Sequence, residues 1–224
     1  MSIENLDPRC AADVDSVALL HEAYLADSPV VKMGKRFIRE FYYSKLVECG
    51  LIGCSVCRVD GRVVGFISYT AHPMDFMGSG LRRYFFSLCW TMLRSVTARP
   101  AMLKEILLTL RVMRSRGHES QEMDTSGLGE ALSLAVLPDF QNYLPPGGRS
   151  RLAFRLFETA LERMRAQGVN RVYLWVQPAN RAANLMYSTM GCTFEKITRM
   201  GMVIHRYTYH VSRPQETGRT EASR

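Results

Sequence analysis

The sequence lacks a long apolar run. Its densest apolar stretch, residues 84–93, spans ten positions, whereas a helix that crosses a membrane needs about 20. The first sixteen residues are polar and acidic and contain no apolar segment of the kind found in a signal peptide. From these absences we expect a cytoplasmic protein without a membrane-spanning segment.

Cysteine and histidine are too scattered for a metal site or a disulfide framework. The six cysteines lie in apolar neighbourhoods, and a chain of this length buries about 70% of its unfolded surface without cross-links. Cys54 and Cys57 fall in a predicted strand, where residues three apart point to opposite faces. The five histidines show no ligand spacing either. We therefore expect no metal and a reducing environment.

The composition also excludes a disordered or fibrous chain. The sequence is 47% apolar and 22% charged, a balance typical of globular proteins, and it contains no internal repeat. We expect a single domain over residues 1–211. Residues 212–224 include no large apolar side chain and are expected to form a disordered tail.

Hydrophobic periodicity and turn residues predict the order of the elements. We expect an α/β (α+β) fold with a mixed, mostly antiparallel sheet of six to seven strands flanked by helices. Asp13 or Asp15 is expected to cap the first helix, and Ser150 the long helix that stops at Gly168. The expected helices cover 13–27, 34–47, 150–168 and 180–190, and the expected strands cover 51–59, 62–70, 131–137, 172–176, 194–200 and 202–210.

The clearest local signal is the dipeptide Asp60-Gly61 between two runs rich in β-forming residues. Both central residues of a two-residue hairpin turn need positive φ angles, which aspartate tolerates and glycine adopts freely. The dipeptide therefore predicts a tight antiparallel hairpin.

Residues 71–126 form an insertion that carries most of the positive charge. Its segment 81–116 has eight basic residues against Glu105, a net charge of +7 in a chain of +8. Helical patterns over 80–97 and 101–116 flank Pro100 and predict a helical hairpin. Its apolar residues either pack within the protein or meet an anionic membrane or a lipid-linked substrate. We expect no nucleic acid, because only charge would favour it.

The segment from Glu130 to Phe194 reads as strand, loop, helix, strand and short helix. A strand that leads through a glycine-containing loop into a helix presents free amide groups and the positive end of the helix dipole, which suits a pyrophosphate. The residues at that turn are Gly147, Gly148, Arg149, Ser150 and Arg151. An ordinary surface loop, with its arginines solvated, is the alternative reading.

Over about 175 residues the chain resembles the Gcn5-related N-acetyltransferase (GNAT) family. The matching segments are LSLAVLP at 132–138, the helix end AQGV at 166–169, VYLWV at 172–176, and Asn180-x-x-Ala183-x-x-x-Tyr187-x-x-x-Gly191. The resemblance implies an acyl-CoA N-acyltransferase fold with a cleft between the splayed segments LSLAV and VYLWV. It also implies direct transfer of an acetyl or short acyl group from acetyl-CoA to a primary amine in a ternary complex.

The resemblance also assigns roles to residues. Asn180 and Ala183 would lie beside the pantetheine arm, and the Tyr187 phenol would protonate the leaving thiolate. A backbone amide near Val136 would meet the carbonyl oxygen of the thioester. A packing tyrosine on an amphipathic helix is the alternative for Tyr187.

For the general base, some members of the family carry a catalytic glutamate where this chain has Glu130. The alternatives are an exposed glutamate at a strand start and a water molecule that relays the proton. The acceptor is expected to be a small-molecule amine, such as an amino sugar, and the protein a monomer or homodimer.

The phosphate loop departs from the family pattern. That pattern has Gln or Arg, two residues, Gly, one residue, then Gly or Ala; here Gly148, Arg151 and Ala153 align, and only Ala153 fits. About seven extra residues, with two prolines that donate no amide, lie between strand and helix. This departure motivates a second hypothesis, a module without turnover that binds a partner or a membrane surface through its basic insertion.

Overall fold

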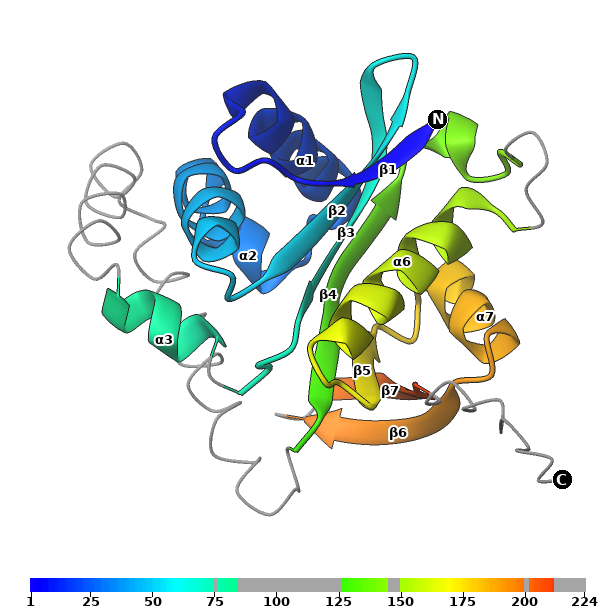
Figure 1. The fold of residues 1–224 in the computed structure, drawn as a ribbon. Helices are drawn as coiled ribbons and strands as arrows, with labels where there is room; N and C mark the ends of the chain where they lie inside the picture. The colour runs from blue at the N-terminus through cyan, green and yellow to red at the C-terminus, as the bar shows by residue number, and fades with distance from the viewer. Residues whose placement is uncertain (75, 84–125, 145–149, 200–201, 212–224) are drawn as a thin grey trace, which may run out of the picture.

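The computed structural model describes residues 1–74, 76–83, 126–144, 150–199 and 202–211 (Figure 1). Seven strands form one sheet in the order β1-β2-β3-β4-β5-β7-β6, with only β4 and β5 parallel. The strands are β1 Ser2–Asn5, β2 Gly53–Val59, β3 Arg62–Thr70, β4 Leu128–Val136, β5 Arg171–Val176, β6 Thr193–Arg199 and β7 Met202–His210. The helices are α1 Ala11–Tyr24, α2 Pro29–Lys32, η1 Phe37–Leu46, α3 Phe76–Arg83, η2 Pro138–Phe140, α6 Leu152–Ala166 and α7 Arg181–Thr189. The predicted mixed sheet is confirmed.

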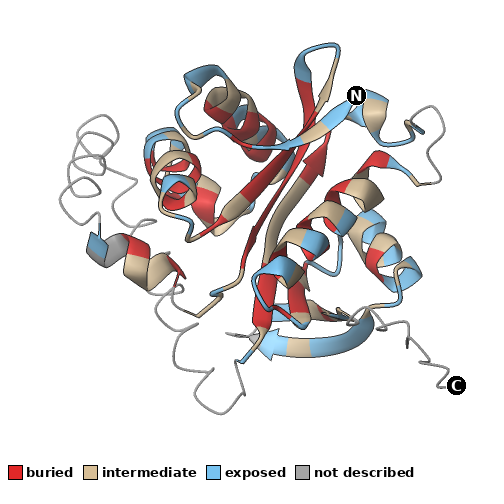
Figure 2. Cartoon of the chain, in the orientation of Figure 1, coloured by how far each residue is buried: buried red, intermediate tan, exposed pale blue. Residues whose placement is uncertain are grey.

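Two apolar cores lie on opposite faces of this sheet. Helices α1 and η1 pack on one face, where Phe66 of β3 contributes to the core. Helices α6 and α7 cover the other face, where Ile67, the next residue of β3, contributes. This alternation is the period of two expected of a strand buried on both sides. Figure 2 shows the buried residues along the central strands and the inner sides of the helices.

The β2–β3 hairpin forms as the sequence predicts. Asp60 and Gly61 both have positive φ, at 49° and 77°, and the two strands pair antiparallel from Gly53 with Tyr69 to Val59 with Arg62. Cys54 and Cys57 point to opposite cores. A shared metal at this pair is therefore excluded by the strand geometry.

Both predicted helix caps are wrong. Helix α1 begins at Ala11 with Cys10 at the N-cap, and α6 begins at Leu152 with Arg151 at the N-cap and no side-chain cap. Asp13 lies instead within the first turn of α1, where its carboxylate contacts Arg58 of β2. The Asp13 carboxylate is therefore engaged in an ion pair with another element rather than with the end of its own helix.

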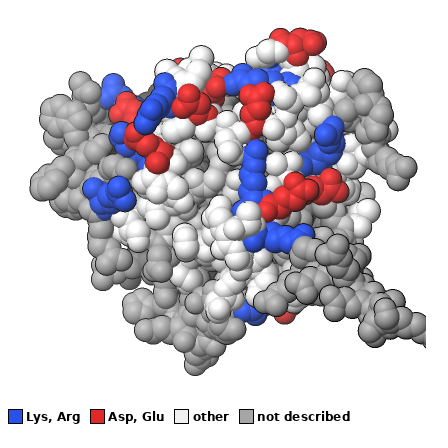
Figure 3. Space-filling view, viewed as in Figure 1, with Lys and Arg blue, Asp and Glu red and all other residues white. Residues whose placement is uncertain are grey.

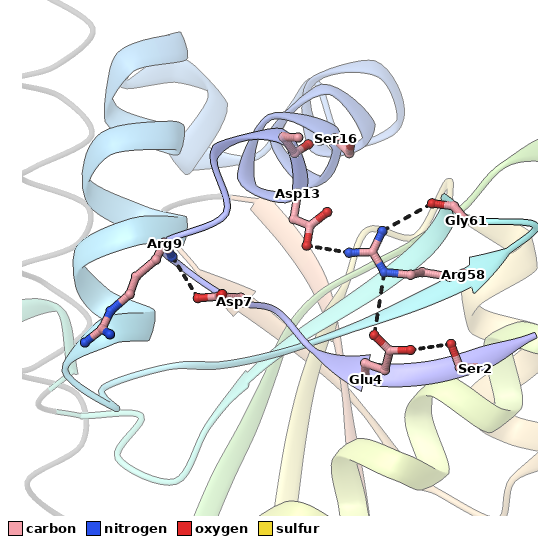
Figure 4. Close-up of polar contacts among 9 residues, drawn as sticks. Ser2, Glu4, Asp7, Arg9, Asp13, Ser16, Arg58 and Gly61 are labelled. Atoms are coloured by element: carbon pink, nitrogen blue, oxygen red, sulfur yellow. Dashed lines mark hydrogen bonds and ion pairs between the residues drawn. The ribbon is translucent and has the colours of Figure 1, made fainter.

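That ion pair belongs to a small polar cluster that holds the N-terminal segment on the hairpin (Figure 4). The Arg58 guanidinium pairs with Asp13 of α1 and, at 3.6 Å, with Glu4 of β1. It also donates to the Gly61 carbonyl in the turn at 3.3 Å. One side chain therefore links β1, α1 and the β2–β3 turn.

The predicted helix at 34–47 is present, but most of it is a π-helix. Residues 37–46 form η1, and Phe37, Ile38, Phe41, Tyr42, Tyr43 and Leu46 are all buried. An α-helix presents a narrower apolar stripe, whereas hydrogen bonds from i to i+5 widen the turn. The wider turn lets two adjacent tyrosines face the core together.

Most of the insertion, including the second helical pattern and the segment 84–116, falls outside the described residues, as does the tail at 212–224. The described start of the insertion forms α3, in which Gly80 packs closely on Leu46 of η1. The short elements β1 and α2 were not predicted. Ser28 caps α2 by accepting from the Val30 amide at 3.2 Å, with Pro29 as the first helical residue.

Candidate active site

The centre of the sheet opens between β4 and β5. These strands pair over only four residue pairs, from Leu128 with Arg171 to Ala131 with Leu174. The pairing of β4 with β3 shifts between Ser68↔Ser133 and Tyr69↔Ala131, which leaves Leu132 as an extra residue. A β-bulge of this kind bends its strand. Pairing with β5 therefore ends where β4 turns away, as expected for two splayed segments.

Beyond the bulge, the backbone of β4 alternates between β3 and the gap. The Leu137 amide donates to the Val64 carbonyl at 2.8 Å, so the backbone groups of Leu137 point to β3. Along a β-strand the backbone N–H and C=O groups of successive residues point alternately to one side and to the other. Those of Val136 and Leu134 therefore point away from β3. The amides of Val136 and Leu134 consequently face the gap. The Val136 carbonyl lies on that side as well, at 3.5 Å from Gln141 Nε2.

Tyr187 projects from α7 into the core that α6 covers. Its ring is only 6% exposed and meets Phe157 of α6 edge to face at 5.4 Å and Tyr207 of β7 at 5.7 Å between ring centroids. The Tyr187 hydroxyl forms no hydrogen bond with another described residue. Burial raises the pKa of this phenol well above its ordinary value. The hydroxyl is therefore protonated at neutral pH and able to donate.

The residues that precede Tyr187 shape the start of α7. The Asn180 side chain caps the helix by accepting from the Ala183 amide at 3.1 Å. Ala183 is half-buried against the core below α6. Gly191, at φ 76°, ends the helix. The four residues of the sequence motif thus define one short helix. Asn180 caps its start, Ala183 and Tyr187 pack on the core, and Gly191 follows its end.

Glu130 lies on the opposite face of the sheet from Tyr187. The preceding residue, Gly129, faces α6, because a Cβ there would meet the Met164 sulfur at 2.9 Å. The Glu130 side chain therefore points to the other side, in register with Thr70 of β3 and Tyr173 of β5. It is 8% exposed. The reading as an exposed glutamate at a strand start is wrong.

The expected phosphate loop is described only in part. Gly147, Gly148 and Arg149 lie outside the described residues. Ser150 precedes α6 and makes no cap, and Arg151 takes the N-cap position. Ala153, in the first turn, packs on the core between α6 and the sheet.

Sequence reasoning missed a set of residues on the C-terminal strands, on the face of the sheet opposite α6. Arg206 of β7 lies over the Tyr173 ring at 4.9 Å and over Trp175 at 6.0 Å. It also donates to the Glu195 carboxylate, from Nε at 3.0 Å. These side chains share the face of Glu130, because Val172, Leu174 and Val176 of β5 point to the other core. The alternation of VYLWV was the signal that could have found them.

Charge is mixed over the described surface. Figure 3 shows acidic and basic side chains interspersed on one face, and the expected basic surface at 81–116 falls almost wholly outside the described residues. The described part contains no group of three or more residues able to hold a metal. Within it, no helix is long and apolar enough to pass through a bilayer.

A groove of about 510 Å³ lies between α7 and the β6–β7 hairpin, lined by Arg181, Asn184, Leu185, Phe194 and His205 among others. A second hollow of about 530 Å³ lies between the segment after β1 and the start of β2. Neither lining includes Glu130 or Tyr187.

The solved structures that share this fold include several acetyltransferases. A GNAT acetyltransferase from Desulfovibrio desulfuricans is 13% identical, with a TM-score of 0.56, and covers 94% of this chain and 99% of its own. An acetyltransferase from Salmonella typhimurium, solved with its cofactor acetyl-CoA, is 12% identical, with a TM-score of 0.55 and 94% of both chains covered. An aminoglycoside 6'-N-acetyltransferase complexed with coenzyme A is 9% identical, with a TM-score of 0.55, and covers 96% of this chain and 99% of its own.

No curated protein matches the sequence. Residues 116–192, the segment that contains β4, α6, β5 and α7, match the model of the acetyltransferase (GNAT) family. The matched segment includes both strands of the opening between β4 and β5. The chain therefore contains a segment similar to the acetyltransferase (GNAT) family and shares the fold of solved acetyltransferases.

Proposed function

We propose that this protein transfers an acetyl or short acyl group from acetyl-CoA to a primary amine. The observation that carries the proposal is the gap between β4 and β5. It begins at the Leu132 bulge and is lined on the β4 side by the amides of Leu134 and Val136. A thioester arm bound in this gap would accept hydrogen bonds from the β4 amides that do not pair with β5. The relatives solved with coenzyme A or acetyl-CoA support this donor.

The two faces of the sheet give the reactants separate approaches. Tyr187 lies on the side of α6 and α7, and Glu130 on the side of α1 and η1. Glu130 removes a proton from the ammonium form of the acceptor, directly or through water. The neutral amine then attacks the thioester carbon, and the amides of β4 donate to the oxygen as it gains negative charge.

Collapse of the tetrahedral intermediate breaks the carbon–sulfur bond and forms the amide. The Tyr187 hydroxyl donates to the departing thiolate and passes its proton to the sulfur. The proton that leaves the attacking nitrogen restores the phenol. The balance is one acetyl group moved, one coenzyme A thiol formed and one proton released from the ammonium.

The acceptor is proposed to be a small-molecule amine. A similar solved structure is an aminoglycoside 6'-N-acetyltransferase, which supports an amino sugar as the first class to test. Tyr173, Trp175 and the Arg206–Glu195 pair lie on the face of Glu130 and offer aromatic surface and charge to a polar amine. Coenzyme A release with aminoglycosides, polyamines and amino acids identifies the class.

We expect Tyr187→Phe to lower kcat about 100-fold, because general acid catalysis contributes that order of rate, with an unchanged Kd for acetyl-CoA. Calorimetry measures the Kd, and coenzyme A release measures kcat. The matched control is Tyr24→Phe, since Tyr24 is 43% exposed on α1. Absence of binding at millimolar acetyl-CoA would overturn the proposal and favour a module without turnover.

A further inference from the structure

Asn184 of α7 uses its whole side-chain amide in hydrogen bonds. Its Nδ2 lies 2.6 Å from the Asn180 carbonyl oxygen and 3.1 Å from the Gln177 carbonyl oxygen. Its Oδ1 lies 2.6 Å from His205 Nδ1 and 2.9 Å from the Tyr207 hydroxyl. One side chain therefore joins α7, the loop before it and β7.

The partners fix the direction of each hydrogen bond. Backbone carbonyls only accept, so the Asn184 nitrogen must face Asn180 and Gln177. The Asn184 oxygen then faces β7, where both His205 Nδ1 and the Tyr207 hydroxyl must donate. This arrangement holds the Tyr207 phenol in one orientation, with its ring 3% exposed.

Tyr207 in turn packs against Tyr187. Their ring centroids are 5.7 Å apart with the planes tilted by 48°, and Phe194 contacts the Tyr207 ring at 5.4 Å. Phe157 contacts Tyr187 at 5.4 Å. The Tyr187 hydroxyl has no hydrogen bond to a described residue, so its direction depends on the rings around it. Of these, Tyr207 is the one anchored by Asn184.

We propose that Asn184 is a positioning residue that aims the Tyr187 hydroxyl at the sulfur of coenzyme A, acting through Tyr207. This inference rests on the proposed function. Asn184 touches neither reactant in this scheme. It also holds the carbonyl of Asn180, the N-cap of the same helix, so the start of α7 and the Tyr187 ring are fixed by one amide.

The test uses coenzyme A itself and needs no acceptor. A hydrogen bond from Tyr187 favours the charged form of the bound thiol and lowers its pKa, which the ultraviolet absorbance of the thiolate reports as pH is raised. Calorimetry on the same variants gives the Kd for coenzyme A. The variants are Tyr187→Phe, Asn184→Leu, Asn184→Asp, Tyr207→Phe and the doubles of Tyr187→Phe with Asn184→Leu or Tyr207→Phe.

We expect Asn184→Leu and Tyr207→Phe each to raise the pKa of the bound thiol by at least half of the change that Tyr187→Phe causes. In the Tyr187→Phe background neither should change it further, because interacting residues are not additive. Asn184→Asp keeps the accepting oxygen for Tyr207 but loses the donor to the Asn180 and Gln177 carbonyls, so it should preserve only the part of the effect that the hydrogen bond to Tyr207 supplies. Leu185→Ala, at a side chain 71% exposed on the same helix, is the control and should leave the thiol unchanged.

The outcomes separate the two proposals. If the wild-type protein does not bind coenzyme A, the proposed function fails. If it binds, and Tyr187→Phe raises the thiol pKa while Asn184→Leu and Tyr207→Phe do not, the positioning role is overturned. The positioning role is also overturned if Asn184→Leu and Tyr207→Phe change the thiol pKa as much in the Tyr187→Phe background as they do alone. Melting temperatures of all variants identify any that do not fold, and Tyr207→Phe, which removes one oxygen atom, keeps the test available if Asn184→Leu is among them.

Discussion

At the scale of single residues, His21 is a buried group whose charge state affects folding. It lies in the last turn of α1 and is fully buried, with Nδ1 at 2.6 Å from the Tyr43 hydroxyl and Nε2 at 2.9 Å from Ser28 Oγ. Its ring also stacks on Phe66. Burial lowers the pKa of His21 from 6.5 to about 4, so the folded protein holds it neutral.

This depressed pKa predicts a stability that falls in mild acid. Between about pH 6.5 and pH 4 the unfolded chain binds a proton at His21 that the folded chain does not. The contribution of His21 to the free energy of unfolding is therefore complete above its pKa in the unfolded chain. It is lost as the pH falls towards its pKa in the folded protein, by roughly 3 kcal/mol in total. Urea unfolding from pH 7 to pH 4 measures it.

His21→Gln should flatten that pH dependence, because glutamine does not titrate. The control is His210→Gln, at an exposed position on β7, which should keep the wild-type slope. An equal slope in wild type and His21→Gln would show that other groups cause the acid sensitivity.

Single residues also mark where sequence reasoning failed. Asp13 and Ser150 are good N-cap residues in isolation, but Asp13 pairs with Arg58 and Ser150 lies one residue before the cap. Such choices depend on partners distant in sequence. Glu130 was identified as a candidate, but its burial could not be read from the sequence, because it requires Thr70 and Tyr173 on the neighbouring strands.

At the scale of elements, β1 is too short to hold its place through pairing alone. It has four residues, and Arg58 links it to α1 and to the β2–β3 turn. The Arg58 side chain is 23% exposed and that of Asp13 15%, so solvent screens this pair less than a fully exposed one. The cluster is therefore expected to contribute measurably to stability.

We expect Arg58→Met to lower the free energy of unfolding by about 1–2 kcal/mol, since hydrogen bonds to charged groups are worth more than exposed ion pairs. Urea unfolding at neutral pH measures the change. Arg36→Met, at an exposed arginine of the N-cap of η1, is the matched control. An equal decrease in the free energy of unfolding in the two variants would mean that the contacts of Arg58 add no stability beyond that of an exposed arginine.

The elements show which local signals suffice. Asp60-Gly61 predicted its hairpin because both backbone requirements are local. The π-helical geometry of η1 was missed, because it follows from packing six large apolar side chains against α1 and the sheet. The motif from Asn180 to Gly191 predicted α7 correctly for the same reason, because it also depends on local residues. Asn180 caps the start of the helix and Gly191 follows its end.

At the scale of the whole molecule, the sheet consists of two halves, β1 to β4 and β5 to β6, joined by four residue pairs. The sequence predicted both strands at this junction but not the bulge at Leu132, which depends on the register with β3. The resemblance to a family supplied the expectation of a cleft there. The periodicity of either strand alone carries no such information.

Hydrogen exchange should distinguish the two sides of β4. The amides of Ser133 and Ala135 point to β3 and should be protected, whereas those of Leu134 and Val136 face the gap and should exchange quickly. Coenzyme A at about 100 times its Kd should slow the latter by up to about 100-fold. Residue-resolved exchange with and without the ligand measures this, and unchanged rates at Leu134 and Val136 would place the ligand elsewhere.

The outermost strand of the C-terminal half has a consequence for the behaviour of the protein in solution. Among the described strands, β6 pairs with β7 alone and forms the outer edge of the sheet, and unpaired sheet edges are where chains can stack into aggregates. Glu195 and Lys196 place opposite charges on consecutive residues of this strand, and both are exposed. Charged side chains at such an edge disfavour the pairing of β6 with a strand of another chain.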